Sequence, residues 1–320
     1  MNTRFAFPLC LAIPLAFSFT LTGCLRTDGS TSLMTSAAKG NASRAERLID
    51  KGADPNETNI NDWTALMFAA REGHADVVKL LLDSGADPNL VSKRITGNTQ
   101  APYPNTTALR EAIRNGHVAI ANTLLDNGAE PDSTAFAIAG GVNDISLLEK
   151  MVAMGADPSA PSAGPDRYHP SALCVASVDG KAETVQWLLE KGVDPNTIAL
   201  GCNPLRAAVN GGHLDVVKLL LAAGANPNVP SSPDRATAFL HAINAHTRSD
   251  RYDPTLEIVK ALLANGADRN YRSAAPPFKN RNALEYAAAK RDESAARGAN
   301  SRYNQGIAKK LGAIVELLEE

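Results

Sequence analysis

The sequence predicts an all-helical solenoid: about eight helix-turn-helix repeats with short β-hairpin fingers, over residues 31–320. Three observations lead to this fold class. A Gly-Ala-Asp motif recurs along the chain, and a fixed spacing precedes most of its copies. Aromatic residues are also scarce, with twelve from residue 24 onward, although a single large globular core usually depends on aromatic side chains. We therefore expect many small packing contacts along an elongated array.

The overall charge and the composition each exclude one class of protein. The chain of 320 residues carries 32 basic and 34 acidic side chains, for a net charge of −2. This balance lacks the basic footprint of a nucleic-acid-binding protein, so we expect no nucleic-acid partner. With 44% hydrophobic residues, the composition is not that of a disordered chain either.

Residues 1–23 are predicted to be an export signal, followed by a tether over residues 24–30. Arg4 supplies a positive start, and an uncharged apolar stretch runs from Phe5 to Thr22. This stretch is almost long enough to span a bilayer, so an uncleaved anchor is the alternative. No other segment approaches 18 consecutive apolar residues.

The end of this segment, Leu21-Thr22-Gly23-Cys24, resembles the lipobox of bacterial lipoproteins. In that family the cysteine is acylated and becomes the new N-terminus, which implies a lipid anchor such as palmitate at Cys24. Two or three acyl chains hold a protein on a membrane far better than one. Leu25 in place of Asp resembles the outer-membrane sorting pattern. The resemblance thus implies a protein on the outer membrane, facing the periplasm and touching the membrane through its lipid alone.

The repeat follows from one motif. Gly-Ala-Asp, with small variations, begins at Gly52, Gly85, Gly128, Gly155, Gly192, Gly224 and Gly266. The gaps are 33, 43, 27, 37, 32 and 42 residues. A period near 33 with insertions and deletions indicates stacked repeats of about that length.

A second spacing shows where the length varies. The first large apolar residue precedes its glycine by 19 residues in six consecutive pairs: Leu33/Gly52, Leu66/Gly85, Leu109/Gly128, Phe136/Gly155, Leu173/Gly192 and Leu205/Gly224. The variation therefore falls after each glycine, in a connecting loop. A packed element whose surface loops accept insertions behaves in this way.

The best-preserved unit, residues 62–89, gives each part of the element a physical reason. Thr64 can cap a first helix by accepting from its free N–H groups. Val78, Leu81 and Leu82 form the apolar stripe of a second helix. Gly85 can take the left-handed conformation that ends this helix.

This unit resembles the ankyrin pattern T-P-L-H-x-A-A…G-H-x-x-V-V-x-L-L-L-x-x-G-A-D-x-N. The resemblance covers residues 31–320 and implies a protein-binding module without chemistry of its own. The units are expected to start near Thr31, Thr64, Thr107, Thr134, Ser171, Asn203, Thr237 and Asn282. The finger before the fourth unit is expected to be nearly absent, because that unit follows Gly128 so closely. The last two units carry insertions between their helices, and the final one resembles a terminal cap.

No residue is expected to carry catalysis, bind a metal or hold a cofactor. His74, His117 and His213 each occupy the inter-helix turn of the pattern and lie in separate units, so they form no ligand pair. No phosphate-binding glycine loop, zinc-protease helix or nucleophile elbow is present in the sequence. We therefore expect that the protein is not an enzyme.

Two cysteines remain after residue 24, in a compartment that is oxidising if the export prediction holds. Cys174 occupies the histidine position of the ankyrin pattern, and Cys202 lies in the next finger. Stacked repeats can bring these positions together, so we expect a disulfide. The alternative is two reduced, half-buried thiols.

Aromatic and arginine side chains in the loops are the candidates for partner contact, because these residue types dominate binding hot spots. The alternative for each is packing within its own loop. The candidates are Trp63, Arg94, Tyr103, Arg167, Tyr168, Tyr252, Tyr271, Arg272 and Phe278.

The expected function is therefore a monomeric, lipid-anchored interaction module of the bacterial envelope that binds another protein. Two alternatives remain. One is an immunity protein that neutralises a toxin delivered into the periplasm, and the other is a structural or stress-protective envelope scaffold.

Overall fold

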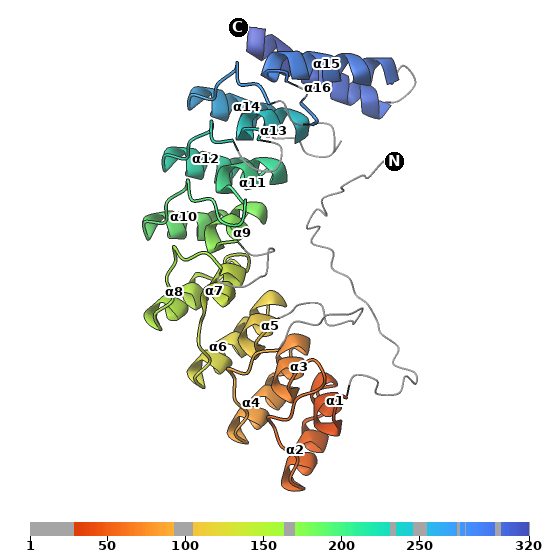
Figure 1. The fold of residues 1–320 in the computed structure, drawn as a ribbon, viewed down its shortest axis with the longest axis vertical. Helices are drawn as coiled ribbons and strands as arrows, with labels where there is room; N and C mark the ends of the chain where they lie inside the picture. The colour runs from red at the N-terminus through yellow and green to blue at the C-terminus, as the bar shows by residue number, and fades with distance from the viewer. Residues whose placement is uncertain are drawn as a thin grey trace.

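A computed structural model describes residues 29–92, 105–162, 170–230, 235–245, 255–273, 276–278, 280–297 and 302–319. These residues form sixteen helices in eight consecutive pairs, with no β-strand among them (Figure 1). We number the pairs as units 1 to 8. The first helices are α1 (Ser32–Ala38), α3 (Ala65–Glu72), α5 (Ala108–Arg114), α7 (Ser133–Ala139), α9 (Ala172–Val178), α11 (Pro204–Gly211), α13 (Ala238–Ala245) and α15 (Ala283–Arg297). The second helices are α2 (Ala42–Asp50), α4 (Ala75–Asp83), α6 (Val118–Asp126), α8 (Ile145–Ala153), α10 (Ala182–Glu190), α12 (Leu214–Ala222), α14 (Thr255–Ala264) and α16 (Arg302–Glu319).

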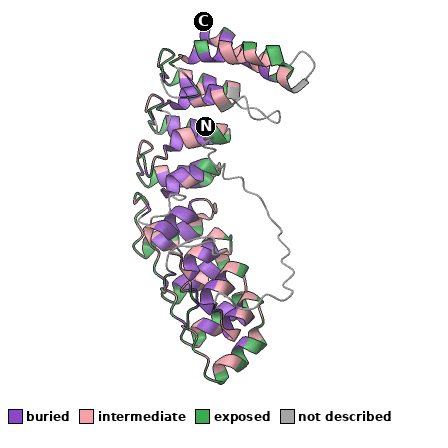
Figure 2. Cartoon of the chain, turned by 45° about the vertical axis from the view of Figure 1, so that its right-hand side comes forward, coloured by how far each residue is buried: buried purple, intermediate pink, exposed green. Residues whose placement is uncertain are grey.

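The pairs stack into a curved array with the first helices along its inner side and the second helices along its outer side (Figure 1). Each first helix packs on the first helices of the neighbouring units, and the second helices pack in the same way. The buried side chains form one apolar cluster that runs from Leu33 in unit 1 to Leu318 in unit 8 (Figure 2). The predicted all-helical solenoid is confirmed.

The helix starts follow from side-chain capping. The threonines at positions 31, 64 and 107, and Ser171, each accept a hydrogen bond from the backbone N–H three residues ahead. Unit 4 differs, because its cap is Asp132 and not Thr134. With almost no finger after Gly128, the chain reaches a capping residue two positions earlier. As a result α7 also ends early, at Ala139, and Gly140 and Gly141 follow it.

The expected β-hairpin fingers are present only as tight closures at the base of five connecting loops. We call these connections between units the finger loops. One backbone bond closes three of them: Asn59 N to Trp63 O (3.1 Å), Ser92 N to Thr106 O (2.9 Å) and Ser162 N to Pro170 O (3.0 Å). Isolated bridges pair Ala199 with Cys202 and Ser273 with Arg281. These closures contain too few hydrogen bonds to form the ladder that defines a β-strand.

Asparagines that follow the Gly-Ala-Asp motif connect successive units. Asn56 donates through Nδ2 to the Gly85 carbonyl (3.0 Å), and its Oδ1 accepts from the Asp87 N–H (2.7 Å). Asn89, Asn196 and Asn228 make the same pair of bonds to the next unit. We call this series the asparagine ladder. It does not continue at units 3 and 4, where the equivalent residues are Asp132 and Ser159.

Histidines at the inter-helix turns connect units on their other side. His74 Nε2 lies 3.3 Å from the Ala38 carbonyl, His117 Nε2 lies 3.1 Å from that of Arg71, and His213 Nε2 lies 2.9 Å from that of Val178. Each ring thus reaches back to the first helix of the preceding unit. Unit 4 has Asp144 at this position, and unit 5 has Lys181.

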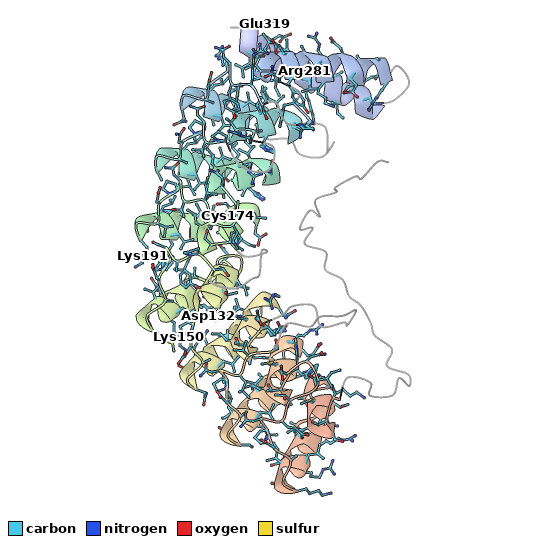
Figure 3. All side chains as sticks on the ribbon, in the orientation of Figure 1. Asp132, Lys150, Cys174, Lys191, Arg281 and Glu319 are labelled. Carbon is cyan, nitrogen blue, oxygen red and sulfur yellow. A yellow bond between two sulfur atoms is a disulfide. The ribbon has the colours of Figure 1, made fainter. Side chains whose placement is uncertain are left out.

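Ion pairs connect units 3 and 4 instead. Arg110 pairs with Asp132 near the finger side. On the outer side, at the residue labelled Lys150 in Figure 3, the ammonium lies 2.8 Å from Asp126 and donates to the Asn122 carbonyl at 3.2 Å. Ion pairs therefore hold the junction between units 3 and 4, whereas ladder asparagines and turn histidines hold the junctions between units 2 and 3 and between units 5 and 6.

Candidate protein-binding surface

Exposed apolar side chains gather on the finger loops. Among the residues that the structure describes, six large apolar side chains are exposed, and four of them belong to these loops: Ile60, Val91, Ile198 and Leu200. Ile60 is 66% exposed and Leu200 is 55% exposed. Burying such side chains against a partner is favourable, at about 25 cal/mol per Å² of apolar surface.

These four side chains occupy two repeat positions in three of the finger loops. Ile60 and Leu200 each follow the glycine of their motif by eight positions, and Val91 and Ile198 follow theirs by six. Equivalent positions in stacked units lie along one side of the array. We call these four residues the finger row. The expectation that aromatic and arginine side chains make the contacts does not include these residues, although an isoleucine between Asn59 and Asn61 in a polar loop is a visible signal.

Trp63 is not a surface residue, contrary to the expectation from sequence. It is 2% exposed, and its ring centre lies 5.0 Å from that of Phe68. The Arg71 guanidinium covers the ring at 5.7 Å. The cause is the tight loop, since Asn59 Oδ1 accepts from the backbone N–H of Trp63 (3.0 Å) and so turns this residue back onto α3. Trp63 therefore belongs to the core beneath the finger loop.

Phe278 also belongs to the core and not to a contact surface. Its side chain is fully buried, 4.9 Å from the ring of Tyr286 and 5.9 Å from that of His241. Tyr286 in turn donates from its hydroxyl to Asn244 Oδ1 at 2.7 Å. Aromatic side chains thus form part of the core of the last two units, although aromatic residues are scarce in the rest of the chain.

Tyr271 and Arg272 lie at the surface but are engaged within the chain. The Tyr271 hydroxyl donates to the Arg235 carbonyl at 2.5 Å. Arg272 donates to both oxygens of Glu285, each at 2.6 Å, and this hydrogen bonding lowers the pKa of the Glu285 carboxyl. Tyr271 thus contacts the connection before unit 7, and Arg272 contacts α15 of unit 8. The remaining candidates, Arg94, Tyr103, Arg167, Tyr168 and Tyr252, and the lipidation candidate Cys24, lie outside the described residues.

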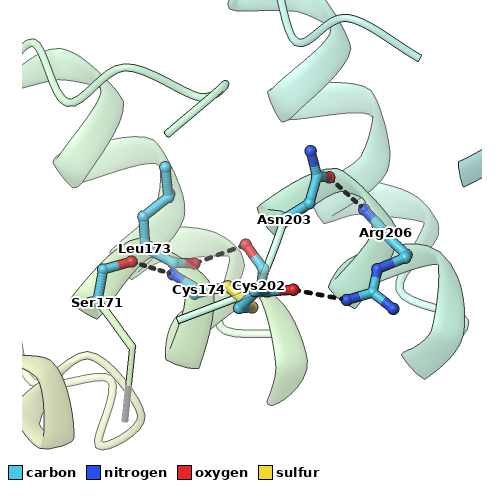
Figure 4. Close-up of a disulfide and its surroundings, with 8 residues drawn as sticks. Ser171, Leu173, Cys174, Cys202, Asn203 and Arg206 are labelled. Carbon is cyan, nitrogen blue, oxygen red and sulfur yellow. Dashed lines mark hydrogen bonds between the residues drawn. A yellow bond between two sulfur atoms is a disulfide. The ribbon is translucent and has the colours of Figure 1, made fainter. Parts of the chain in front are cut away.

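Cys174 and Cys202 are joined by a disulfide between units 5 and 6 (Figure 4). Cys174 is buried near the start of α9, where its backbone N–H donates to Ser171 Oγ at 3.3 Å. Cys202 closes the short finger loop through two backbone bonds with Ala199. Between them, Leu200 and Gly201 both have positive φ, 48° and 78°. The disulfide therefore fixes the loop that presents Leu200 (Figure 4).

The described parts of the chain contain no cluster of three or more residues that could hold a metal ion. In the same parts, none of the helices has the length and apolar character needed to cross a membrane.

Comparison with known proteins agrees with this architecture. The family model described as Ankyrin repeats (3 copies) matches residues 14–92 and 136–231, and the model Ankyrin repeat matches residues 105–136. The chain is 33% identical over 98 residues to the Ankyrin repeat and MYND domain-containing protein 1 of Homo sapiens, which is 30% of this chain and 10% of that protein. It is 41% identical over 87 residues to the 2-5A-dependent ribonuclease of Mus musculus, which is 26% of this chain and 12% of that protein. The chain thus spans about a tenth of the length of these curated relatives.

Among solved structures, the human ASB11 ankyrin repeat domain aligns with a TM-score of 0.45 and 24% identity, covering 87% of this chain and 96% of that chain. The family models match more than half of the sequence, so the chain belongs to the ankyrin-repeat family, whose repeats form protein-interaction modules.

Proposed function

We propose that this chain is a lipid-anchored protein of the bacterial cell envelope that binds another protein through the finger row and the adjoining first helices. The finger row carries the proposal, because its apolar side chains are exposed at equivalent positions of separate units. A row of this kind suits an elongated partner that contacts several units at once.

The lipid anchor is proposed from Cys24 and its flanking sequence. Seven positions separate Cys24 from Thr31, the residue that caps α1. Such a segment reaches at most about 25 Å. An acylated Cys24 would hold unit 1 close to the membrane and leave the rest of the array facing the periplasm.

Partner binding is tested by changing the finger row in the full chain. Ile60→Asp with Leu200→Asp places charges where the partner would bury apolar surface, so capture of the partner from envelope extracts should fall at least tenfold. The matched control is Met154→Asp, since Met154 is 42% exposed at the end of α8 and lies outside the finger row. Equal capture by wild type and the finger-row variant would contradict the proposal.

The captured protein decides between the roles. A toxin whose effect on cells is suppressed by this chain would identify an immunity protein, whereas a resident envelope component would identify a scaffold. The anchor is tested separately by Cys24→Ala, which should release the protein from the membrane fraction and abolish incorporation of a labelled fatty acid. Retention of the label in this variant would contradict the proposed lipid anchor but not the proposed protein binding.

A further inference from the structure

An open cleft of about 520 Å³ lies where units 3, 4 and 5 meet at their inter-helix turns. Arg114 and Gly116 of unit 3, Ile138 and Asp144 of unit 4, and Val175 and Asp179 of unit 5 are among the residues that line it. Its volume is within the range of sites that hold small ligands or side chains, about 300–1,000 Å³.

The same position is filled by a histidine ring at three other junctions. The rings of His74, His117 and His213 cover the inter-helix glycines of the preceding units, Gly40, Gly73 and Gly180. A β-carbon placed on these glycines would lie 2.4–2.6 Å from the nearest ring atom. The glycine thus forms a flat floor, and the ring lies directly on it.

Gly116 is the corresponding glycine of unit 3, and its floor is uncovered. A β-carbon built there meets no atom within 4 Å. The residue that would cover it is Asp144, but this side chain turns onto its own helix. Its Oδ1 accepts from the Leu147 N–H at 2.9 Å and from Ser146 Oγ at 2.6 Å, and so caps α8.

The early end of α7 widens the same region. Gly140 and Gly141 follow this helix where α3 continues for another turn. A β-carbon on Gly141 would approach Asp179 Oδ2 at 2.7 Å, so the carboxylate of unit 5 lies directly over unit 4. Two carboxylates therefore line the cleft, those of Asp144 and Asp179.

The one arginine of the cleft is already paired. Arg114 Nη1 lies 2.5 Å from Glu111 Oε1, and Glu111 is buried. At the other three junctions the histidine Nε2 bonds the carbonyl two residues before the glycine, and in unit 3 that carbonyl belongs to Arg114. A carbonyl oxygen has two lone pairs and can accept an additional donor.

We infer that this cleft binds a planar, positively charged side chain of the protein partner, a guanidinium or an imidazolium, in the position that the array's own histidines fill elsewhere. The planar group would stack over Gly116, donate an N–H to the Arg114 carbonyl and lie beside the carboxylates of Asp144 and Asp179. The inference rests on the proposed protein-binding function and adds the chemistry of one contact to it.

The test uses small molecules, so it does not depend on finding the partner. The ¹⁵N-labelled full chain is titrated with N-acetyl-arginine amide, N-acetyl-histidine amide and N-acetyl-lysine amide while amide shifts are recorded. We expect saturable shifts centred on Gly116, Gly141 and Val142 with the arginine and histidine compounds and at least threefold weaker binding of the lysine compound. Equal binding of the lysine compound would show attraction by charge alone and overturn the inference, as would the absence of localised shifts.

Two variants locate the binding. Asp144→His supplies the missing ring and should abolish the shifts, and it should fold because histidine precedes α4, α6 and α12 at the same position. Asp144→Asn keeps a capping side chain but removes the charge, so binding should weaken about fivefold. Asp215→His, at an exposed position in the first turn of α12, is the matched control and should bind as wild type. Unchanged shifts in Asp144→His would overturn the site.

Partner capture separates this inference from the proposed function. If Asp144→His captures the partner as well as wild type while the finger-row variant does not, the protein-binding function stands and the use of the cleft by the partner is wrong.

Discussion

Cys174 of unit 5 is bonded to Cys202 of the following finger loop, with their Cα atoms 6.4 Å apart. The bond therefore spans a junction between repeats, at which neighbouring units otherwise meet through packing and a few hydrogen bonds.

Cys202→Ser should destabilise this junction by about 3 kcal/mol, because a cross-link over 28 residues restricts the unfolded chain. Hydrogen exchange of units 5 and 6 measures the effect locally. A reductant should produce the same change in wild type and no further change in the variant. Equal exchange in oxidised wild type and in the variant would contradict this expectation.

Ser159→Asn should add a rung to the asparagine ladder. Ser159 already shares the local geometry of the ladder residues, since its N–H bonds Asp157 Oδ1 at 2.8 Å just as Asn89 N–H bonds Asp87 Oδ1 at 2.8 Å. The new side chain should reach the Gly192 carbonyl and stabilise the array by about 1 kcal/mol. Urea unfolding measures this gain, and Asn89→Ser should produce a loss of similar size. A Ser159→Asn chain that unfolds at the wild-type midpoint would show that unit 4 is stacked differently.

Trp63→Ala should reduce stability by about 3 kcal/mol, since it removes a buried ring that packs on Phe68. Ile60→Ala in the same loop should change stability by less than about 0.5 kcal/mol, because the side chain is exposed. Thermal unfolding of both variants separates support of the loop from surface contact. A stability loss in Ile60→Ala as large as that in Trp63→Ala would place both residues in the core.

Acid should weaken the cap of α8. Hydrogen bonds from Ser146 and Leu147 lower the pKa of Asp144 from its usual 3.8. The folded state thus favours the ionised carboxylate, which stabilises the array above pH 3.8 and loses this contribution as the pH falls through the lowered pKa. Asp144→Asn has no such group, so wild type should lose more stability than the variant between pH 6 and pH 3 in urea unfolding. Parallel losses in both chains would show that the carboxylate contributes nothing.

The helix starts could be predicted because they depend on local chemistry. A threonine or serine caps the free N–H three residues ahead of it through its own side chain, and at Thr64 and Ser171 it does so although the residue is buried. The helix start expected near Thr134 lies at Asp132 instead. The connection after Gly128 has almost no finger, and this shifts the whole of α7. Here the connection, and not the helix propensity, set the boundary.

The contact residues were harder to predict than the fold. Trp63 was expected at the surface because of its residue type, but two hydrogen bonds with Asn59 hold its backbone in the tight loop, and its ring packs on Phe68. The ladder was hidden for another reason. Each asparagine lies four positions after its motif glycine, but its bonds reach residues 29, 39, 28 and 38 positions away, so the pairing becomes visible only when the units are stacked.

The bonds at the base of the finger loops bear on how this protein can evolve. The bond from Asn59 N to Trp63 O encloses residues 60–62 of the sequence, whereas the bond from Ser92 N to Thr106 O in the next unit encloses residues 93–105. Insertions and deletions can therefore accumulate beyond that bond while the helices inside it keep their partners. Selection can change what each unit meets outside the molecule at little cost to its folding, and neighbouring units can diverge in recognition independently of one another.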